Sequence, residues 1–189
     1  LLLLFFLSLP LNAQKHAKNV ILLLGDAGGV STLNAASLHH YGEPQQLFIQ
    51  QMPHIALSDT STATEWVSDS AAGMTAIVTG VKTLNGVVAQ GPDAVRKQKD
   101  GRELKTILEY AEEHGLATGV VTNMTVTDAT PASCYAHAND RKQYSRIFQQ
   151  LLDPRFGDGV DVLIGPGRSD IEKALQADGL GIDSLLSKA

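Results

Sequence analysis

The sequence predicts an α/β fold built on a parallel β-sheet. Three mostly apolar runs, residues 19–24, 117–122 and 160–165, are typical of buried strands, because strands covered on both faces are continuously hydrophobic. Segments with helical periodicity separate these runs, and strands that alternate with helices form parallel sheets with right-handed crossovers. The sequence shows no internal repeat, low-complexity tract or interdomain linker. We therefore expect residues 14–189 to belong to a single domain.

The first half of the chain is expected to hold two strands and two helices. Residues Lys18–Asp26 are expected to form a central strand that ends at a polar residue. Ser31–His40 is expected to form a helix with Ser31 as its N-cap. A weak strand over His54–Ser58 precedes a Thr/Ser-rich loop, and a helix is expected from about Ser70 to Thr79.

The second half repeats the alternation. A polar, Gly-rich loop spans residues 85–102, and a helix with good periodicity runs from Glu103 to His114 and ends at Gly115. The remaining elements are expected in this order: a strand at 117–122, helical segments at 131–137 and 141–152, and a strand at 160–165.

Composition describes an ordinary globular protein. Of the 189 residues, 43% are hydrophobic and 19% are charged, and the net charge is −5. This charge, with no run of Lys or Arg, argues against a nucleic-acid-binding surface. Cys134 is the single cysteine, so no internal disulfide can form, and we expect it to be a small buried apolar residue.

Residues 1–11 form an apolar run that ends near Ala13. This resembles the hydrophobic region of a secretory signal peptide with cleavage after Ala13, and it is shorter than the roughly 20 residues that a membrane span needs. The basic segment and the initiator Met are absent, so residues 1–13 are interpreted as part of a signal peptide. We therefore expect a secreted or periplasmic protein without a transmembrane span.

The most informative motif is Asp69-Ser70-Ala71-Ala72, where a carboxylate precedes a serine at the start of an expected helix. Helix N-termini offer free N–H groups and a positive dipole end, so they suit a phosphate group that meets a serine hydroxyl. The same residues could equally be an ordinary helix cap, because Asp and Ser are common at N-cap positions.

Three further residues carry oxygen ligands suited to a metal ion. Asp26 ends the first expected strand, and Asp128 and Thr130 lie two positions apart, on one side of an extended segment. A turn at Asp26 and a helix cap at Thr130, before Pro131, are the alternatives. In open parallel sheets ligands bind beyond the carboxyl ends of the strands, so these residues and Ser70 are expected to meet at one sheet edge.

Ser70 needs activation to act as a nucleophile. No histidine lies near it in the sequence, and the Gly-x-Ser-x-Gly motif is absent, so activation by a metal ion is the favoured route. Arg141 is the best candidate for a bidentate phosphate clamp, although most arginines are solvated surface residues.

Taken in order, the motifs around Asp26, Ser70 and Asp128 resemble those of the alkaline phosphatase family. The resemblance extends from Lys18 to about Arg168. It implies a three-layer α/β/α sandwich and an enzyme that hydrolyses phosphate monoesters with two zinc ions and one magnesium ion.

The resemblance also implies a role for each matching residue. Ser70 is the expected nucleophile that becomes phosphoserine, Asp69 orients Arg141, and Arg141 grips the phosphate of a small-molecule ester. Asp26 is expected to bridge zinc and magnesium, and Asp128 and Thr130 match positions on the magnesium side. The resemblance further implies a homodimer.

Two features depart from the family pattern. Gly25-Asp26-Ala27-Gly28-Gly29 stands where the family usually shows Gly-Asp-Gly-Met-Gly, and the family's remaining zinc ligands come from a C-terminal part that has no counterpart here. We therefore expect this chain to be the N-terminal part of the enzyme, with most zinc ligands outside it and little or no turnover alone. A phosphodiesterase-like member of the superfamily and a non-catalytic exported phosphate-binding domain are the alternatives.

Overall fold

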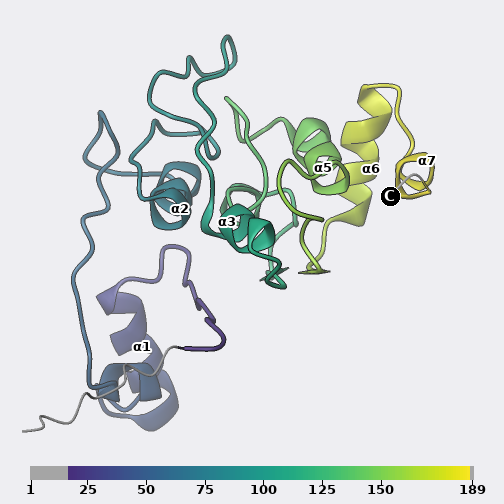
Figure 1. Cartoon of the computed structure of the whole chain (residues 1–189). Coiled ribbons are helices and arrows are strands. Elements are labelled where there is room, and N and C mark those ends of the chain that lie inside the picture. Colours follow the sequence, from purple (N-terminus) through teal and green to yellow (C-terminus); the bar gives the residue numbers. More distant parts are fainter. Residues whose placement is uncertain (1–16, 188–189) are drawn as a thin grey trace, which may run out of the picture. The chain divides into compact units, whose positions relative to one another are not determined.

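The computed structural model describes residues 17–187, so the expected signal peptide at residues 1–13 lies outside the described residues. The chain divides into two compact units that meet between Pro53 and His54 in the sequence (Figure 1). The first unit contains α1 (Val30–Tyr41) and the short 3-10 helix η1 (Phe48–Gln51). The second unit contains α2 (Ser70–Thr79), α3 (Ile107–Glu113), β1 (Gly119–Val121), α4 (Ala129–Ala132), α5 (Tyr144–Leu152), β2 (Val162–Ile164), α6 (Arg168–Ala177) and α7 (Ile182–Leu186).

In the first unit the expected strand from Lys18 to Asp26 is wrong. Residues 19–25 have no regular secondary structure, and Val20 and Leu23 are 83% and 87% exposed. A strand forms only where its N–H and C=O groups pair with a neighbouring strand, and the described part of this unit contains no strand. Apolar composition alone therefore does not make these residues a strand.

The first helix agrees with the sequence except at its start. Gly29 occupies the N-cap position of α1, so the expected cap, Ser31, lies inside the first turn. At the other end Gly42 adopts the left-handed conformation, with φ of 74°, and its N–H donates to the carbonyl of Leu38. A left-handed residue after the last turn is the usual end of a helix, and glycine adopts it without steric cost.

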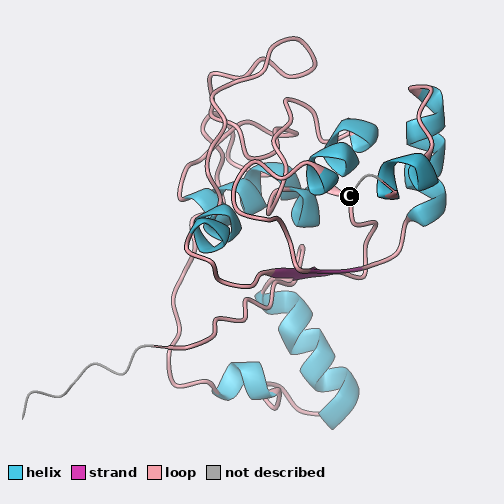
Figure 2. Cartoon of the chain, turned by 45° about the vertical axis from the view of Figure 1, so that its right-hand side comes forward, coloured by secondary structure: helices cyan, strands magenta, loops and turns pink. Residues whose placement is uncertain are grey.

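The second unit contains the parallel strand pair that defines the α/β class. β1 and β2 pair in parallel, with Val120 opposite Leu163, and the helices of this unit lie on one side of the pair (Figure 2). Val120 is buried beneath them, whereas Val121 is 72% exposed on the other face. The expected strand over His54–Ser58 is wrong, because these residues form no pairing in the described chain and stay exposed.

Two hydrophobic clusters hold the helices of the second unit together. The first joins α2 and α4 to β1 and the buried Ile147 of α5. Here α2 and α4 pack against each other, and each contributes a fully buried alanine to the cluster, Ala71 and Ala132. Such small side chains let two helix backbones come close. The second cluster joins α5 to α6 and α7. These last two helices were not predicted from the sequence.

The other helix boundaries follow local signals. α3 begins at Ile107 rather than at Glu103, because Thr106 forms a capping box with Glu109. Gly115 then follows the helix in the left-handed conformation, as expected. Among residues 17–187, no helix has the length and apolar character required to cross a membrane.

Candidate active site

Ser70 is the first residue of α2, where the sequence placed it. The Asp69 carboxylate caps this helix by accepting a hydrogen bond from the N–H of Ala72 at 3.0 Å. Gly80, with φ of 73°, ends the helix, so both ends agree with the expected span. Asp69 therefore serves as a helix cap, and the Ser70 hydroxyl lies at the positive end of the helix dipole.

Arg141 joins the predicted catalytic residues of the second unit. Its Nη1 donates to Ser70 Oγ at 3.0 Å and to Asp69 Oδ2 at 3.2 Å, and its Nη2 donates to Asp128 Oδ1 at 3.3 Å. The two carboxylates lie against different nitrogens of the guanidinium, which fixes the orientation of its plane. One arginine thus connects the N-termini of α2 and α4.

The backbone of Arg141 is held by a neighbouring segment of the chain. Its N–H donates to the carbonyl of Gly86 at 2.7 Å, and Val88 and Ala138 exchange two hydrogen bonds in an isolated antiparallel bridge. These backbone bonds place the Arg141 side chain beside Ser70. Arg141 lies in the loop between α4 and α5. The sequence predicted that this second helix would begin at Arg141, but α5 begins at Tyr144.

The local charges keep this arginine cationic. Partial burial lowers the pKa of Arg141, but the hydrogen bond to Asp69 and the charges of Asp69 and Asp128 outweigh it, so the pKa lies above its usual value. The Arg141 side chain is 22% exposed, so part of it remains accessible from outside. The arrangement offers a permanent cation and a hydroxyl to an incoming anion.

Asp128 and Thr130 adopt a different geometry from the one expected. Asp128 is the N-cap residue of α4 and has extended backbone, but Thr130 already lies in the helix. The two residues therefore do not alternate along an extended segment, and the expected cap at Thr130 is wrong, because the helix starts at Ala129. The Asp128 carboxylate makes no cap hydrogen bond and is directed to Arg141 instead.

Asp26 lies in the first unit, in a turn that the N–H of Gly28 closes on the carbonyl of Gly25 at 2.9 Å. A Cβ at Gly28 would lie 2.9 Å from that same carbonyl oxygen, so the turn requires glycine there. Within residues 17–187, no three His, Cys, Asp or Glu side chains gather in a way that could hold a metal ion. The metal-ligand roles of Asp26, Asp128 and Thr130 stay predictions.

Asn85 is a site residue that the sequence reading missed. Its Oδ1 accepts the backbone N–H of Asp69 at 2.7 Å, and its Nδ2 donates to Glu65 and to the carbonyl of Val67. In the sequence, Asn85-Gly86 is a common turn dipeptide and carries no signal of a contact with a segment so far upstream. Only the folded chain brings it to Asp69.

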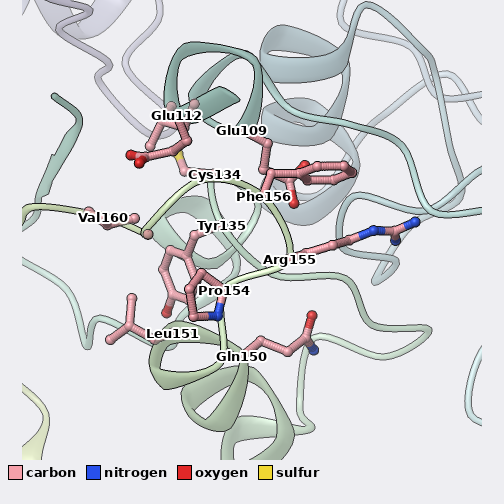
Figure 3. Close-up of a pocket in the computed structure, with 12 residues that line it drawn as sticks. Glu109, Glu112, Cys134, Tyr135, Gln150, Leu151, Pro154, Arg155, Phe156 and Val160 are labelled. Carbon is pink, nitrogen blue, oxygen red and sulfur yellow. The ribbon is translucent and has the colours of Figure 1, made fainter. Parts of the chain in front are cut away.

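Two hollows of the second unit lie away from these residues. One, of about 20 Å³, is bordered by α3, α5 and residues 154–160, and Figure 3 shows Glu112, Tyr135 and Phe156 around it. It has room for about one water molecule and therefore cannot admit a phosphate ester. A wider hollow of about 530 Å³ is lined by residues that include His137 and Gln150. Neither Ser70 nor Arg141 borders either one.

Two residues near these hollows have structural roles. Cys134 is buried as expected, and burial raises the pKa of its thiol to about 12, so it is not a nucleophile at moderate pH. His137 is also buried, between the carbonyl of Ala89 at 2.8 Å and the carboxylate of Glu109 at 2.7 Å. Both nitrogens of the ring are therefore occupied by protein atoms.

Comparisons with known proteins show that the chain is similar to alkaline phosphatases. The family model described as alkaline phosphatase matches residues 17–182. Alkaline phosphatase 4 of Drosophila melanogaster is 34% identical over 178 residues, with 82% of this chain and 30% of the relative covered. The tissue-nonspecific alkaline phosphatase of Gallus gallus is 40% identical over 178 residues, with 82% of this chain and 34% of the relative covered.

Solved structures agree with these sequence relatives. Alkaline phosphatase from the Antarctic bacterium TAB5 is similar with a TM-score of 0.65 and 28% identity, over 82% of this chain and 42% of that one. The Thermus thermophilus alkaline phosphatase has a TM-score of 0.66 and 32% identity, over 82% of this chain and 31% of that one. A TAB5 variant was solved with Mg bound in its M3 site. The chain spans about a third of the length of the curated relatives.

Proposed function

The chain belongs to the alkaline phosphatase family, and on this premise we propose that it supplies the nucleophile and the phosphate clamp of a phosphate monoester hydrolase. The observation that carries the proposal is the hydrogen bond of 3.0 Å from Arg141 to the Ser70 hydroxyl, with Asp69 and Asp128 on either side of the guanidinium. A cation fixed beside a hydroxyl at a helix N-terminus is the arrangement that a transferring phosphoryl group requires.

Ser70 is proposed to act in two steps. In the first, its Oγ attacks phosphorus and loses its proton, the Oγ–P bond forms, and the bond to the ester oxygen breaks; that oxygen takes up one proton and leaves as the alcohol. In the second, water attacks phosphorus, the Oγ–P bond breaks, Ser70 regains its proton from that water, and inorganic phosphate is released. The Ser70 side chain can accept the phosphoryl group because it lies at the first position of α2, where the helix dipole favours negative charge.

Arg141 is proposed to bind the non-bridging oxygens of the phosphoryl group. Asp69 and Asp128 hold the guanidinium in place, so the clamp is oriented before the substrate arrives and loses little freedom on binding. The pKa of Arg141 is raised by these partners, which keeps the clamp charged at the alkaline pH where a serine hydroxyl is most readily deprotonated. These proposed contacts involve the phosphoryl group alone, so they give no preference for the alcohol part of the ester.

The chain's metal-binding residues are proposed from the chemistry of their side chains. Asp26, Asp128 and Thr130 are oxygen donors, which fit a hard cation such as Mg²⁺. Asp128 fits this role because its carboxylate is not used to cap α4. When bound, zinc and magnesium would lower the pKa of the serine hydroxyl and neutralise charge on the phosphoryl group. Export through a signal peptide at residues 1–13 and homodimerisation remain further parts of the proposal.

The test is hydrolysis of a chromogenic phosphate monoester at alkaline pH by the protein that carries this sequence. We expect activity that a chelator abolishes and that divalent metal restores. Ser70→Ala should remove activity while leaving the thermal unfolding midpoint within the range of other surface variants. Activity that persists after chelation, or in Ser70→Ala, would be incompatible with a metal-activated serine.

A further inference from the structure

Asn85 and Gly86 form a turn that contacts both halves of the proposed site. On one side the Asn85 side chain accepts the backbone N–H of Asp69 at 2.7 Å. On the other side the carbonyl of Gly86 accepts the backbone N–H of Arg141 at 2.7 Å. The hydrogen bond from Arg141 to Ser70 closes a ring that runs through this turn. Two consecutive residues therefore hold the backbone on both sides of the contact between nucleophile and clamp.

The Asn85 amide also holds the loop that leads into α2. Its Nδ2 donates to the carbonyl of Val67 at 3.1 Å and to Glu65 Oε2 at 2.9 Å, while its Oδ1 faces Asp69. One side chain thus fixes the loop before and after Ser68. Inside the helix, the Asp69 cap on Ala72 fixes the same segment from the other side.

The geometry requires an amide. Donor and acceptor must lie on one planar group, because Asp69 presents an N–H and Val67 presents a carbonyl. A carboxylate at position 85 would keep the bond to Asp69 but would oppose the Val67 carbonyl and the Glu65 carboxylate. Glycine suits the next position, because Gly86 has φ of 81°, a backbone conformation that residues with a Cβ rarely adopt.

We propose that Asn85 is a positioning residue that sets the register between Ser70 and Arg141. This role rests on the proposed function: Asn85 acts on the reaction through Asp69 and the Gly86 turn and does not contact the substrate. Misplacement of reacting groups by about 1 Å can cost on the order of 100-fold in rate. Loss of the Asn85 amide should therefore lower catalysis and phosphate binding far more than it lowers stability.

The test compares Asn85→Asp with Gln98→Glu in the protein that carries this sequence. Gln98 is exposed in the same loop, so its substitution matches the change from amide to acid without contacting the site. Four quantities are measured for each variant: kcat and KM for a chromogenic phosphate monoester, the Kd for inorganic phosphate, and the thermal unfolding midpoint. We expect kcat to fall roughly 100-fold in Asn85→Asp and the Kd to rise at least about tenfold.

A second substitution separates geometry from charge. Glu65→Gln in the Asn85→Asp background restores the native net charge, and the amide introduced at position 65 can donate to the carboxylate introduced at position 85. It should recover about tenfold of the lost kcat but not all of it, because the bond to Val67 is still missing. Full recovery would mean that charge alone was responsible and would overturn the inference. If Asn85→Asp does not fold, Asn85→Gln keeps the amide but lengthens the side chain, and the same losses are expected.

The two proposals fail in different ways. If the unsubstituted protein neither hydrolyses the ester nor binds phosphate, the proposed function is wrong and the inference falls with it. If that protein is active and Asn85→Asp behaves like Gln98→Glu, the proposed function stands and the positioning role of Asn85 is wrong.

Discussion

Replacing Arg141 with lysine tests the phosphate clamp while keeping its charge. The guanidinium now reaches Ser70 at 3.0 Å through Nη1 and Asp128 at 3.3 Å through Nη2. A lysine ammonium is a single point donor and cannot contact both carboxylates and a phosphate in one plane. Arg141→Lys should therefore lose at least one hydrogen bond between charged groups at the phosphate.

The magnitude follows from that loss. A hydrogen bond to a charged group contributes about 1.5–3 kcal/mol, so the Kd for inorganic phosphate should rise about 10- to 150-fold. Since the clamp contacts substrate and transition state alike, KM should rise together with a fall in kcat/KM. The assay is competition of inorganic phosphate against a chromogenic monoester, supported by calorimetric titration of phosphate.

Arg146→Lys is the matched control. Arg146 pairs with Asp100 through two hydrogen bonds of 3.1 and 3.0 Å on the exposed face of α5, so its substitution removes an equivalent fork away from Ser70. An Arg141→Lys protein that binds phosphate as tightly as Arg146→Lys would refute the assignment of Arg141 as the clamp. Weak binding by both variants would point to a general loss of structure instead.

Two further predictions concern stability. Burial raises the pKa of Glu112, as does the neighbouring Asp158. A raised pKa of a carboxyl group in the folded state makes the protein lose stability as pH rises above the pKa of that group in the unfolded state. Glu112→Gln should therefore raise the thermal unfolding midpoint at about pH 8 and leave it unchanged at about pH 4, and equal effects at both pH values would contradict this. Glu109→Ala leaves the buried His137 and the N–H of Thr106 without their partner, so the free energy of unfolding measured in urea should fall by about 3 kcal/mol. The amide of Glu109→Gln can accept from Thr106 and donate to His137, so the same free energy should fall by less than about 1 kcal/mol. Similar losses in both variants would argue against this network.

Local signals explain which elements the sequence predicted well. α2 has a cap at Asp69, a run of helix formers and a glycine at its end, and its bounds agree with the expected ones. The parallel pairing of β1 and β2 was also expected, and it confirms the α/β class. By contrast, residues 19–24 have the composition of a buried strand, but strand formation depends on a partner that composition does not reveal.

The site shows the same division. The sequence motifs identified Ser70, Asp69 and Arg141 as candidate site residues, and the structure brings these three side chains together. Asn85 was not readable, because a turn dipeptide looks the same whether or not its side chain crosses to another loop. The geometry of Asp128 and Thr130 was misjudged because α4 begins at Ala129, ahead of the start that Pro131 suggested.

The central claim is that Ser70 carries the phosphoryl group, and trapping that group tests it most directly. The protein that carries this sequence is mixed with a phosphate monoester, quenched in acid and digested, and the peptides are analysed by mass spectrometry. The account predicts phosphate on the peptide that contains Ser70, and none in Ser70→Ala. Phosphate on another residue, or an active protein that never carries it on Ser70, would contradict the account.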